Sequence, residues 1–287
     1  MLAILNKELK SYFASATGYI FMSFFLLISG IFFSLTNLFG RSPLYNDVLS
    51  SITFIFLFVV PMITMRLISE ETKQKTDQLL LTSPIKVSDI VLGKYFAALG
   101  LFLATLGVTI IFPIILSFFG EISTGEILGG YIGFFLLGAS FISVGIFISS
   151  LTDNQVIAAV VTVVTLLIMW IMDGIIMGMP KDRTSSMVFI GILVIAITAL
   201  FYFSTRNIYM SIAISVIGAI GMIIVFLINP GLYDGIILRI LGWFSLLKRH
   251  ENFSMGIFDV NAVVYFITFS FAFIFLTIQT IEKRRWS

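Results

Sequence analysis

The sequence predicts an all-α polytopic membrane protein, and three observations lead to this fold class. Of the 287 residues, 59% are hydrophobic and only 11% are charged, whereas soluble domains carry about 25% charged residues. The mean hydropathy is +1.10. Apolar stretches that approach the length needed to cross a bilayer, about 20 residues, recur along the whole chain. We therefore expect an N-terminal interfacial helix followed by about eight transmembrane helices.

Composition also excludes several classes of function. The net charge is +2 and no basic cluster stands outside the last residues, which argues against a nucleic-acid partner. Without cysteine, neither disulfides nor thiolate chemistry is possible. The single histidine, His250, rules out a multi-histidine metal site. Because His250 lies beside Lys248, Arg249 and Glu251, we expect it to be solvated and to have no catalytic role.

Residues 1–17 predict an amphipathic helix that lies in the membrane interface as an elbow before the first span. One helical stripe carries its apolar residues, which are Leu2, Leu5, Leu9, Tyr12, Phe13 and Ala16. The segment is not expected to be a cleavable signal, since the apolar stretch after Lys7, Glu8 and Lys10 is long enough to span and no small-residue cleavage site follows.

Residues 18–287 then form the predicted transmembrane permease domain. The expected spans are Gly18–Phe39, Ser51–Leu67, Tyr95–Phe119, Leu128–Ser150, Val156–Met177, Met187–Phe203, Ile208–Ile228 and Ala262–Ile281. The sixth and seventh form a tight pair, which is either a hairpin of two full spans or partly re-entrant. Asp173, towards the end of the fifth span, is a candidate for the transport pathway because intramembrane carboxylates are commonly functional, unless the helix ends near Gly174 and leaves it at the interface.

Lysine and arginine near the span ends set the expected orientation. With the N-terminus inside, the cytoplasmic segments hold more basic residues than the outer ones, and the Lys283-Arg284-Arg285 end is a strong stop signal. We expect both termini to be cytoplasmic and the chain to lie in the cell membrane. The long segment 229–261 would then be extracytoplasmic, with a turn at Asn229-Pro230-Gly231 and a helix near 236–244 lying on or dipping into the outer leaflet.

Residues 66–94 form the longest polar interval in the chain and are its best candidate for contact with a water-soluble partner. The composition from Glu70 to Thr82 favours a helix that Pro84 ends, and Ser88 is the expected N-cap of a second helix with Asp89 in its first turn. This second helix runs directly into the third span. We therefore expect that a displacement of the first of these two helices would be transmitted to the transmembrane bundle. An ordinary connecting loop packed on the bundle is the alternative.

Sequence motifs of catalysis are absent. No GxxxxGK[ST] phosphate-binding loop and no GxGxxG after a strand occur, and HExxH is impossible with one histidine. The adjacent acids Glu70 and Glu71 would point about 100° apart on a helix and would not converge on one bond. The chain by itself is therefore not expected to be an enzyme.

The run EETKQKTDQLLLTSPIKVSDIVLGKYFAAL resembles the cytoplasmic loop of ABC type-2 transporter permeases, in which an acidic pair precedes a similar leucine-rich run. It is most similar to permeases of the gliding-motility and nitrous-oxide-accessory type. Residues 149–160 and 245–268 resemble further parts of these proteins, and the N-terminal helix resembles their elbow helix. The departure is the pair Met187–Ile228, since such permeases typically have six spans.

The resemblance implies that segment 66–94 docks into a separate ABC ATP-binding subunit, which would bind ATP and Mg, and that a second permease chain, identical or paralogous, completes the transporter. No cofactor is expected in this chain itself. The residues that the resemblance assigns to coupling are Glu70, Glu71, Thr76, Gln78, Leu79, Leu80, Leu81, Thr82, Ser83 and Pro84. Glu70 and Glu71 would lie at the hinge between this lever and the bundle.

Two other functions remain open from the sequence. A secondary transporter driven by an ion gradient would need buried ionisable groups, for which Asp173 is the one candidate, and paired broken repeats, which are not visible. A non-transporting scaffold that anchors an ATPase at the membrane is compatible with the same sequence. The apolar, aromatic spans mildly favour a lipid-like or hydrophobic peptide cargo, and the sequence does not identify the substrate.

Overall fold

The computed structural model describes residues 1–76, 85–243 and 245–286. All regular elements of the described residues are helical, and eight of these helices are long and apolar enough to cross a membrane. The predicted fold class is confirmed. The chain divides into two compact units, one made of residues 1–170 and 246–287 and the other of residues 171–245, and each is described by itself.

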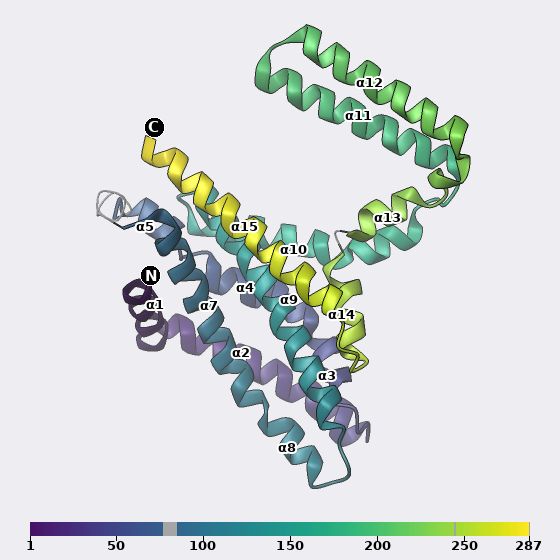
Figure 1. Ribbon diagram of the computed structural model, residues 1–287. Helices are drawn as coiled ribbons and strands as arrows, with labels where there is room; N and C mark the ends of the chain where they lie inside the picture. The colour runs from purple at the N-terminus through teal and green to yellow at the C-terminus, as the bar shows by residue number, and fades with distance from the viewer. Residues whose placement is uncertain (77–84, 244, 287) are drawn as a thin grey trace. The chain divides into compact units, whose positions relative to one another are not determined.

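The first unit begins with α1 (Leu2–Ala14), a break at Ser15, and α2 (Ala16–Phe33), which continues as a π-helical turn η1 (Ser34–Phe39). Both α1 and the end of α15 lie at the same end of this unit as α5 (Figure 1). The remaining elements are α3 (Asn46–Ser51), η2 (Ile52–Ile55), α4 (Phe56–Thr64), α5 (Ser69–Lys73), α7 (Val87–Thr109), α8 (Ile111–Ser117), α9 (Thr124–Leu151), the first part of α10 (Gln155–Gly178), α14 (Leu246–Ser254) and α15 (Val260–Trp286).

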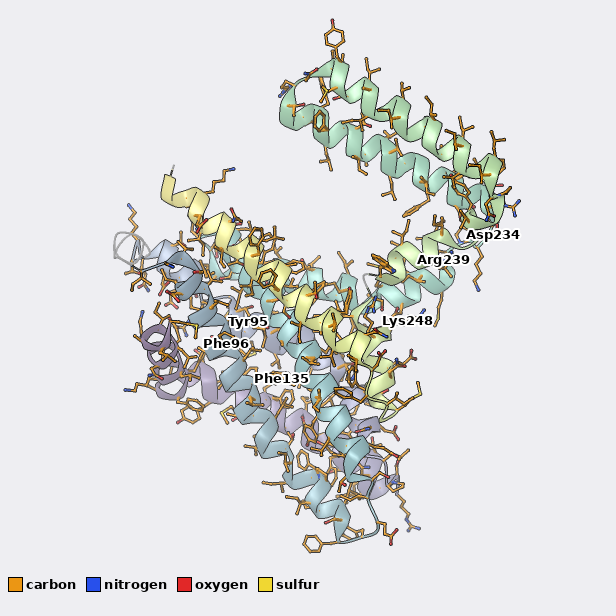
Figure 2. The ribbon with its side chains drawn as sticks, in the orientation of Figure 1. Tyr95, Phe96, Phe135, Asp234, Arg239 and Lys248 are labelled. Atoms are coloured by element: carbon orange, nitrogen blue, oxygen red, sulfur yellow. The ribbon has the colours of Figure 1, made fainter. Side chains whose placement is uncertain are left out.

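Aromatic residues fill the centre of the first unit around α9, which is the most deeply buried of the eight helices. Phe56 of α4 packs edge-on against Phe102 of α7 with ring centroids 5.6 Å apart, and Phe134 of α9 lies 4.7 Å from Phe56. Tyr95 of α7 reaches α9, where its hydroxyl donates to the carbonyl of Ala139 at 3.3 Å (Figure 2). Large rings thus hold α4, α7 and α9 together, and hydrogen bonds join α7 to α9.

Glycines on α9 let its neighbours approach closely. A Cβ at Gly133 would lie 2.3 Å from the Cβ of Phe253 of α14, and one at Gly138 would lie 2.4 Å from the ring of Phe102. Gly145 meets Thr64 of α4 in the same way. Small residues serve this purpose in membrane bundles, where dispersion contacts between helices replace the hydrophobic effect.

The second unit contains the hairpin of α11 (Arg183–Thr205) and α12 (Ile208–Ile228), followed by η3 (Pro230–Tyr233) and α13 (Ile236–Trp243). Arg206 makes the sharp turn in the left-handed conformation, with φ 55°. At 23 and 21 residues the two helices are each long enough for a full span. At the other end of the hairpin, the Tyr233 hydroxyl donates to the carbonyl of Met222 at 2.7 Å.

Polar contacts fix where α11 begins. The carboxylate of Asp182 accepts from the backbone N–H of Ser185 at 2.9 Å, and this bond lowers the pKa of Asp182 below its usual range. Arg183 pairs with Asp234, which lies just after η3, at 3.1 Å (Figure 2 labels Asp234). The helix expected from the spacing of residues 236–244 is present as α13.

The segment 229–261 contains more helix than the sequence indicated, because α14 also lies in it. The expectation that His250 is solvated is wrong. His250 lies on the face of α14 that packs against α9, its side chain is 3% exposed, and its ring meets Phe134 edge-on at 6.3 Å. The neighbouring charged residues had suggested a polar loop, whereas the helical spacing of Leu246, His250 and Phe253 places these three on one buried face.

The glycine contacts of α9 give a direct test. Gly133→Ala should destabilise the protein by about 1–3 kcal/mol, because the new methyl group overlaps Phe253 and must displace α14. Gly107→Ala is the matched control: it also lies inside a long helix, but an added Cβ meets no other atom within 4 Å. Thermal unfolding in detergent should show a lower midpoint for the first variant alone, and equal midpoints would refute this account of the packing.

Candidate functional site

A buried lysine joins three separate parts of the chain at one end of the first unit. The Lys94 side chain of α7 is 2% exposed, and its Nζ lies 2.9 Å from Glu8 of α1 and 2.9 Å from Glu71 of α5. Glu71 also lies 3.6 Å from Lys7. One ammonium thus bridges two carboxylates that would otherwise repel each other, and it fixes the start of the polar segment against both α1 and α7.

The helix α1 is docked along α7 by apolar contacts on either side of this charge cluster. A Cβ at Gly93 would lie 3.0 Å from Ile4, and one at Gly100 would lie 3.1 Å from Leu9. Tyr12 is buried, and its hydroxyl donates to the carbonyl of Ile63 at 3.2 Å. Burial, and secondarily Glu8, raises the pKa of Tyr12 well above its ordinary value, so the hydroxyl keeps the proton that it donates.

The chain breaks its helix between α4 and α5, and another helix satisfies the freed backbone groups. Ser149, near the end of α9, accepts from the N–H groups of Ile68 and Ser69 at 3.3 and 3.2 Å. A serine normally caps its own helix, whereas here α9 caps α5 from outside. The position of α5 therefore depends on the end of α9.

Glu70 takes a different direction from Glu71, as expected for adjacent residues on a helix. Its carboxylate accepts from Nε of Arg66 at 2.9 Å, and Arg66 also donates to the Thr17 hydroxyl at 2.6 Å. This second set of contacts ties α5 to the first turn of α2. The two acids thus hold two different neighbours.

The C-terminal helix reaches the same place. Arg284 of α15 donates to the hydroxyl of Thr72 at 3.4 Å and to the carbonyl of Ser150. Together with the contacts above, α5 is joined to α1, α2, α7, α9 and α15. A displacement of this five-residue helix would therefore act on most of the bundle at once.

The helix expected from Glu70 to Thr82 ends much earlier, and that prediction is wrong in its described part. α5 stops at Lys73, and Lys75 takes the left-handed conformation with φ 57°. The N–H of Thr76 then bonds to the carbonyl of Glu71 at 3.0 Å, and that of Lys75 bonds to Thr72 at 3.1 Å. These two bonds form a Schellman motif, which satisfies the last carbonyls of the helix and ends it.

The predicted N-cap at Ser88 is also wrong, since α7 begins at Val87 with Lys86 as the cap residue. Lys86 has the extended backbone conformation of a cap residue, with ψ 140°, and Val87 after it is already helical. The helix therefore begins two residues before the first residue that a cap at Ser88 would have given. Asp89 does lie in the first turn, where its carboxylate is 3.8 Å from the amino terminus of Met1. The predicted continuity is correct, because α7 runs unbroken from this turn to Thr109.

Comparison with protein families decides what kind of protein carries this cluster. Residues 33–229 match the family described as ABC-2 family transporter protein, which is more than half of the chain. The chain belongs to the ABC-2 transporter family. No curated protein matches the sequence. The family match, together with the eight apolar helices, makes this a multi-pass membrane permease of the ABC type, and membership implies an ABC ATP-binding partner.

The matched region of this ABC-2 protein includes both helices of the additional pair and ends just after α12. The pair belongs to a compact unit of its own, residues 171–245. The charge cluster of Lys94, Glu8 and Glu71 lies entirely in the other unit. The additional pair, α11 and α12, therefore contributes no residue to this cluster.

The structure brings together three of the residues assigned to coupling, namely Glu70, Glu71 and Thr76. The other seven lie outside the described residues, and they are Gln78, Leu79, Leu80, Leu81, Thr82, Ser83 and Pro84. Lys94, Glu8 and Arg284 were missed as members of the cluster. A lysine that directly follows an apolar run was the available signal for Lys94, because such a residue must either reach water or find a partner.

Asp173 lies far along the chain from this cluster, in the part of α10 that belongs to the second unit. α10 continues to Gly178, past the end at Gly174 that the sequence had left open. Asp173 is partly exposed rather than buried. Within the described residues, no group of three or more histidine, cysteine or acidic side chains could hold a metal ion.

The buried cluster makes a stability prediction for Lys94. Lys94→Met removes the shared cation and leaves Glu8 and Glu71 facing each other, so it should cost about 3–5 kcal/mol of unfolding free energy. Thermal unfolding of the purified chain would measure the loss. Adding Glu8→Gln and Glu71→Gln to the same chain should recover most of it, and failure of this triple variant to recover would show that the lysine acts by packing instead.

The histidine makes a separate prediction about pH. Burial lowers the pKa of His250 from 6.5 to about 4, which a weak contact with the backbone of Gly133 opposes only in part. The unfolded chain binds a proton between these values and the folded chain does not, so stability is complete above pH 6.5 and falls as the pH approaches 4. The full loss is about 3 kcal/mol.

Unfolding midpoints at pH 7.5, 6 and 5 would test this, with His250→Leu as the reference. Relative to His250→Leu, the unchanged protein should lose stability as the pH falls from 7.5 to 5. Parallel curves would mean that His250 does not carry this part of the acid sensitivity.

Proposed function

We propose that this chain is the permease subunit of an ATP-driven exporter, and that segment 66–94 receives the motion of a separate ATP-binding subunit. The observation that carries the proposal is the convergence of α1, α2, α7, α9 and α15 on the short helix α5. A lever must be joined to what it moves, and an ordinary connecting loop needs no such set of charged contacts.

The assignment of roles follows from these contacts. Glu71 and Glu70 hold the base of the lever, through Lys94 and Arg66 respectively. The leucines 79–81, which lie outside the described residues, would enter a groove on the ATP-binding subunit. ATP and Mg would be bound by that subunit, and a second permease chain, identical or paralogous, would complete the pathway.

Orientation and family type complete the proposal. We place both termini and α5 in the cytoplasm and the chain in the cell membrane, because basic residues are more frequent on that side. The α1 helix would lie in the membrane interface as an elbow, and α13 with α14 would face the outer side. We assign the protein to the gliding-motility and nitrous-oxide-accessory type on the sequence of residues 70–99, with the substrate undefined.

Two alternatives receive less support. A transporter driven by an ion gradient would need a buried ionisable group in its pathway, and Asp173 is partly exposed. The buried ammonium of Lys94 is paired with two partly buried acids, Glu8 and Glu71, and these contacts join helices together. A scaffold that anchors an ATPase without transport would use the same docking segment, so turnover separates it from an exporter.

The experiment is an affinity purification of this chain from its native membrane in mild detergent, with ATPase activity measured on the eluate. We expect an ATP-binding subunit to co-elute, and to be lost when Leu79, Leu80 and Leu81 are replaced by Asp. A folded chain that elutes without any ATPase would contradict the proposal.

The acidic pair tests coupling rather than docking. Glu70→Ala with Glu71→Ala should leave the ATP-binding subunit bound but lower substrate-stimulated ATPase activity at least several-fold, because the base of the lever is loosened. Asp153→Ala, an exposed acid in the turn after α9, is the matched control and should keep full activity. Unchanged activity in the double variant would remove Glu70 and Glu71 from the mechanism.

A further inference from the structure

A cleft lies between the chain at the end of η1 and the turn that joins α8 to α9. This turn lies at the end of the first unit opposite to α5 (Figure 1). Its volume is about 380 Å³, within the range of about 300–1,000 Å³ that is typical of small-molecule sites. Leu38, Leu116 and Phe119 form its apolar wall, and Asn37, Arg41 and Glu121 supply its polar groups.

Asn37 has an unsatisfied buried atom. The residue is 4% exposed, and its Nδ2 donates to the carbonyls of Ser42 and Leu44 at 2.7 and 3.2 Å. Its Oδ1 is buried and has no hydrogen-bond partner among the described residues. Because an unpaired buried acceptor is costly, a donor from outside the chain is the natural partner for this oxygen.

The two charged residues of the cleft are also unpaired. Among the described residues, neither Arg41 nor Glu121 forms an ion pair, and they do not pair with each other although they line the same cleft. Arg41 is held in the left-handed conformation, with φ 53°. The cleft is therefore lined by a cation, a carboxylate and an asparagine whose amide oxygen has no partner among the described residues.

These groups are complementary to a headgroup that carries a phosphate and a primary ammonium. A guanidinium is the preferred partner of a phosphate, which it binds with two parallel hydrogen bonds. A carboxylate and an amide oxygen are acceptors for the N–H donors of an ammonium. The apolar wall suits the first methylenes of an acyl chain, and the neighbouring Phe118 and Phe119 are 82% and 77% exposed, as expected beside lipid.

We propose that this cleft binds the phosphoethanolamine headgroup of a membrane phospholipid, with the phosphate on Arg41 and the ammonium shared by Glu121 and Asn37. The site is separate from the coupling cluster, and it requires only that these helices stand in a bilayer. It would fix a lipid at the end of α2 and α8, where the two helices have no direct polar contact across the cleft in the described residues.

Native mass spectrometry of the purified full chain, with phosphatidylethanolamine, phosphatidylcholine and phosphatidylglycerol titrated in turn, tests the proposal. Phosphatidylethanolamine should bind about tenfold more tightly than phosphatidylcholine, whose quaternary ammonium has no N–H to donate. Arg41→Gln should weaken phosphatidylethanolamine about tenfold. Glu121→Gln should remove the preference for phosphatidylethanolamine over phosphatidylcholine. The affinity for phosphatidylglycerol should stay the same or increase.

Arg239→Gln and Glu251→Gln, which change the same residue types away from the cleft, are the controls and should bind as the unchanged chain does. Unfolding midpoints of all variants separate a lost site from a lost fold. Equal binding of the three lipids, or equal effects of cleft and control variants, would overturn the proposal. Full competition by soluble glycerophosphoethanolamine at similar concentrations would overturn the membrane lipid as the source.

Discussion

The paired, buried ammonium of Lys94 is the interaction on which the α5 end of this permease depends. An isolated ammonium inside a protein is strongly disfavoured, so it must be paired or lose its proton. Here two carboxylates from different parts of the chain, Glu8 and Glu71, satisfy it at 2.9 Å each. A displacement of Lys94 would take the shared cation away from both carboxylates, and a displacement of either acid would remove one of the two contacts of a buried ammonium. These contacts tie the first helix, the short helix α5 and the third span to one another at this point.

The rest of the first unit is arranged to support that body. α9 runs through its centre and uses glycines to bring large or branched side chains of α4, α7 and α14 into close contact. Near its end, Ser149 of the same helix caps α5. α9 is therefore held by close packing along its length, and its last turn also holds α5 by hydrogen bonds. A helix held so tightly transmits displacement instead of absorbing it.

The two ends of the first unit handle charge in opposite ways. At the α5 end, acids and bases are paired across helices, and Lys94, the most buried of these charges, has two acidic partners. At the opposite end, Arg41, Glu121 and the amide oxygen of Asn37 surround one cleft without pairing. Paired charges join helices, whereas unpaired charges beside a cleft can bind a ligand. This contrast separates the part of the molecule that we connect with the ATPase from the part that we connect with lipid.

The sequence alone determined the fold class and the number of spans. Long apolar runs can only be helices in a bilayer, since each backbone group must find its partner within the segment. The divergence of Glu70 and Glu71 also followed from helix geometry. Only the tertiary structure decided which charges meet, because Glu8, Glu71 and Lys94 are distant in sequence and helix packing alone brings them together. It likewise buried His250 against Phe134 of α9, and ended α5 at Lys73 through a backbone turn that residue propensities do not encode.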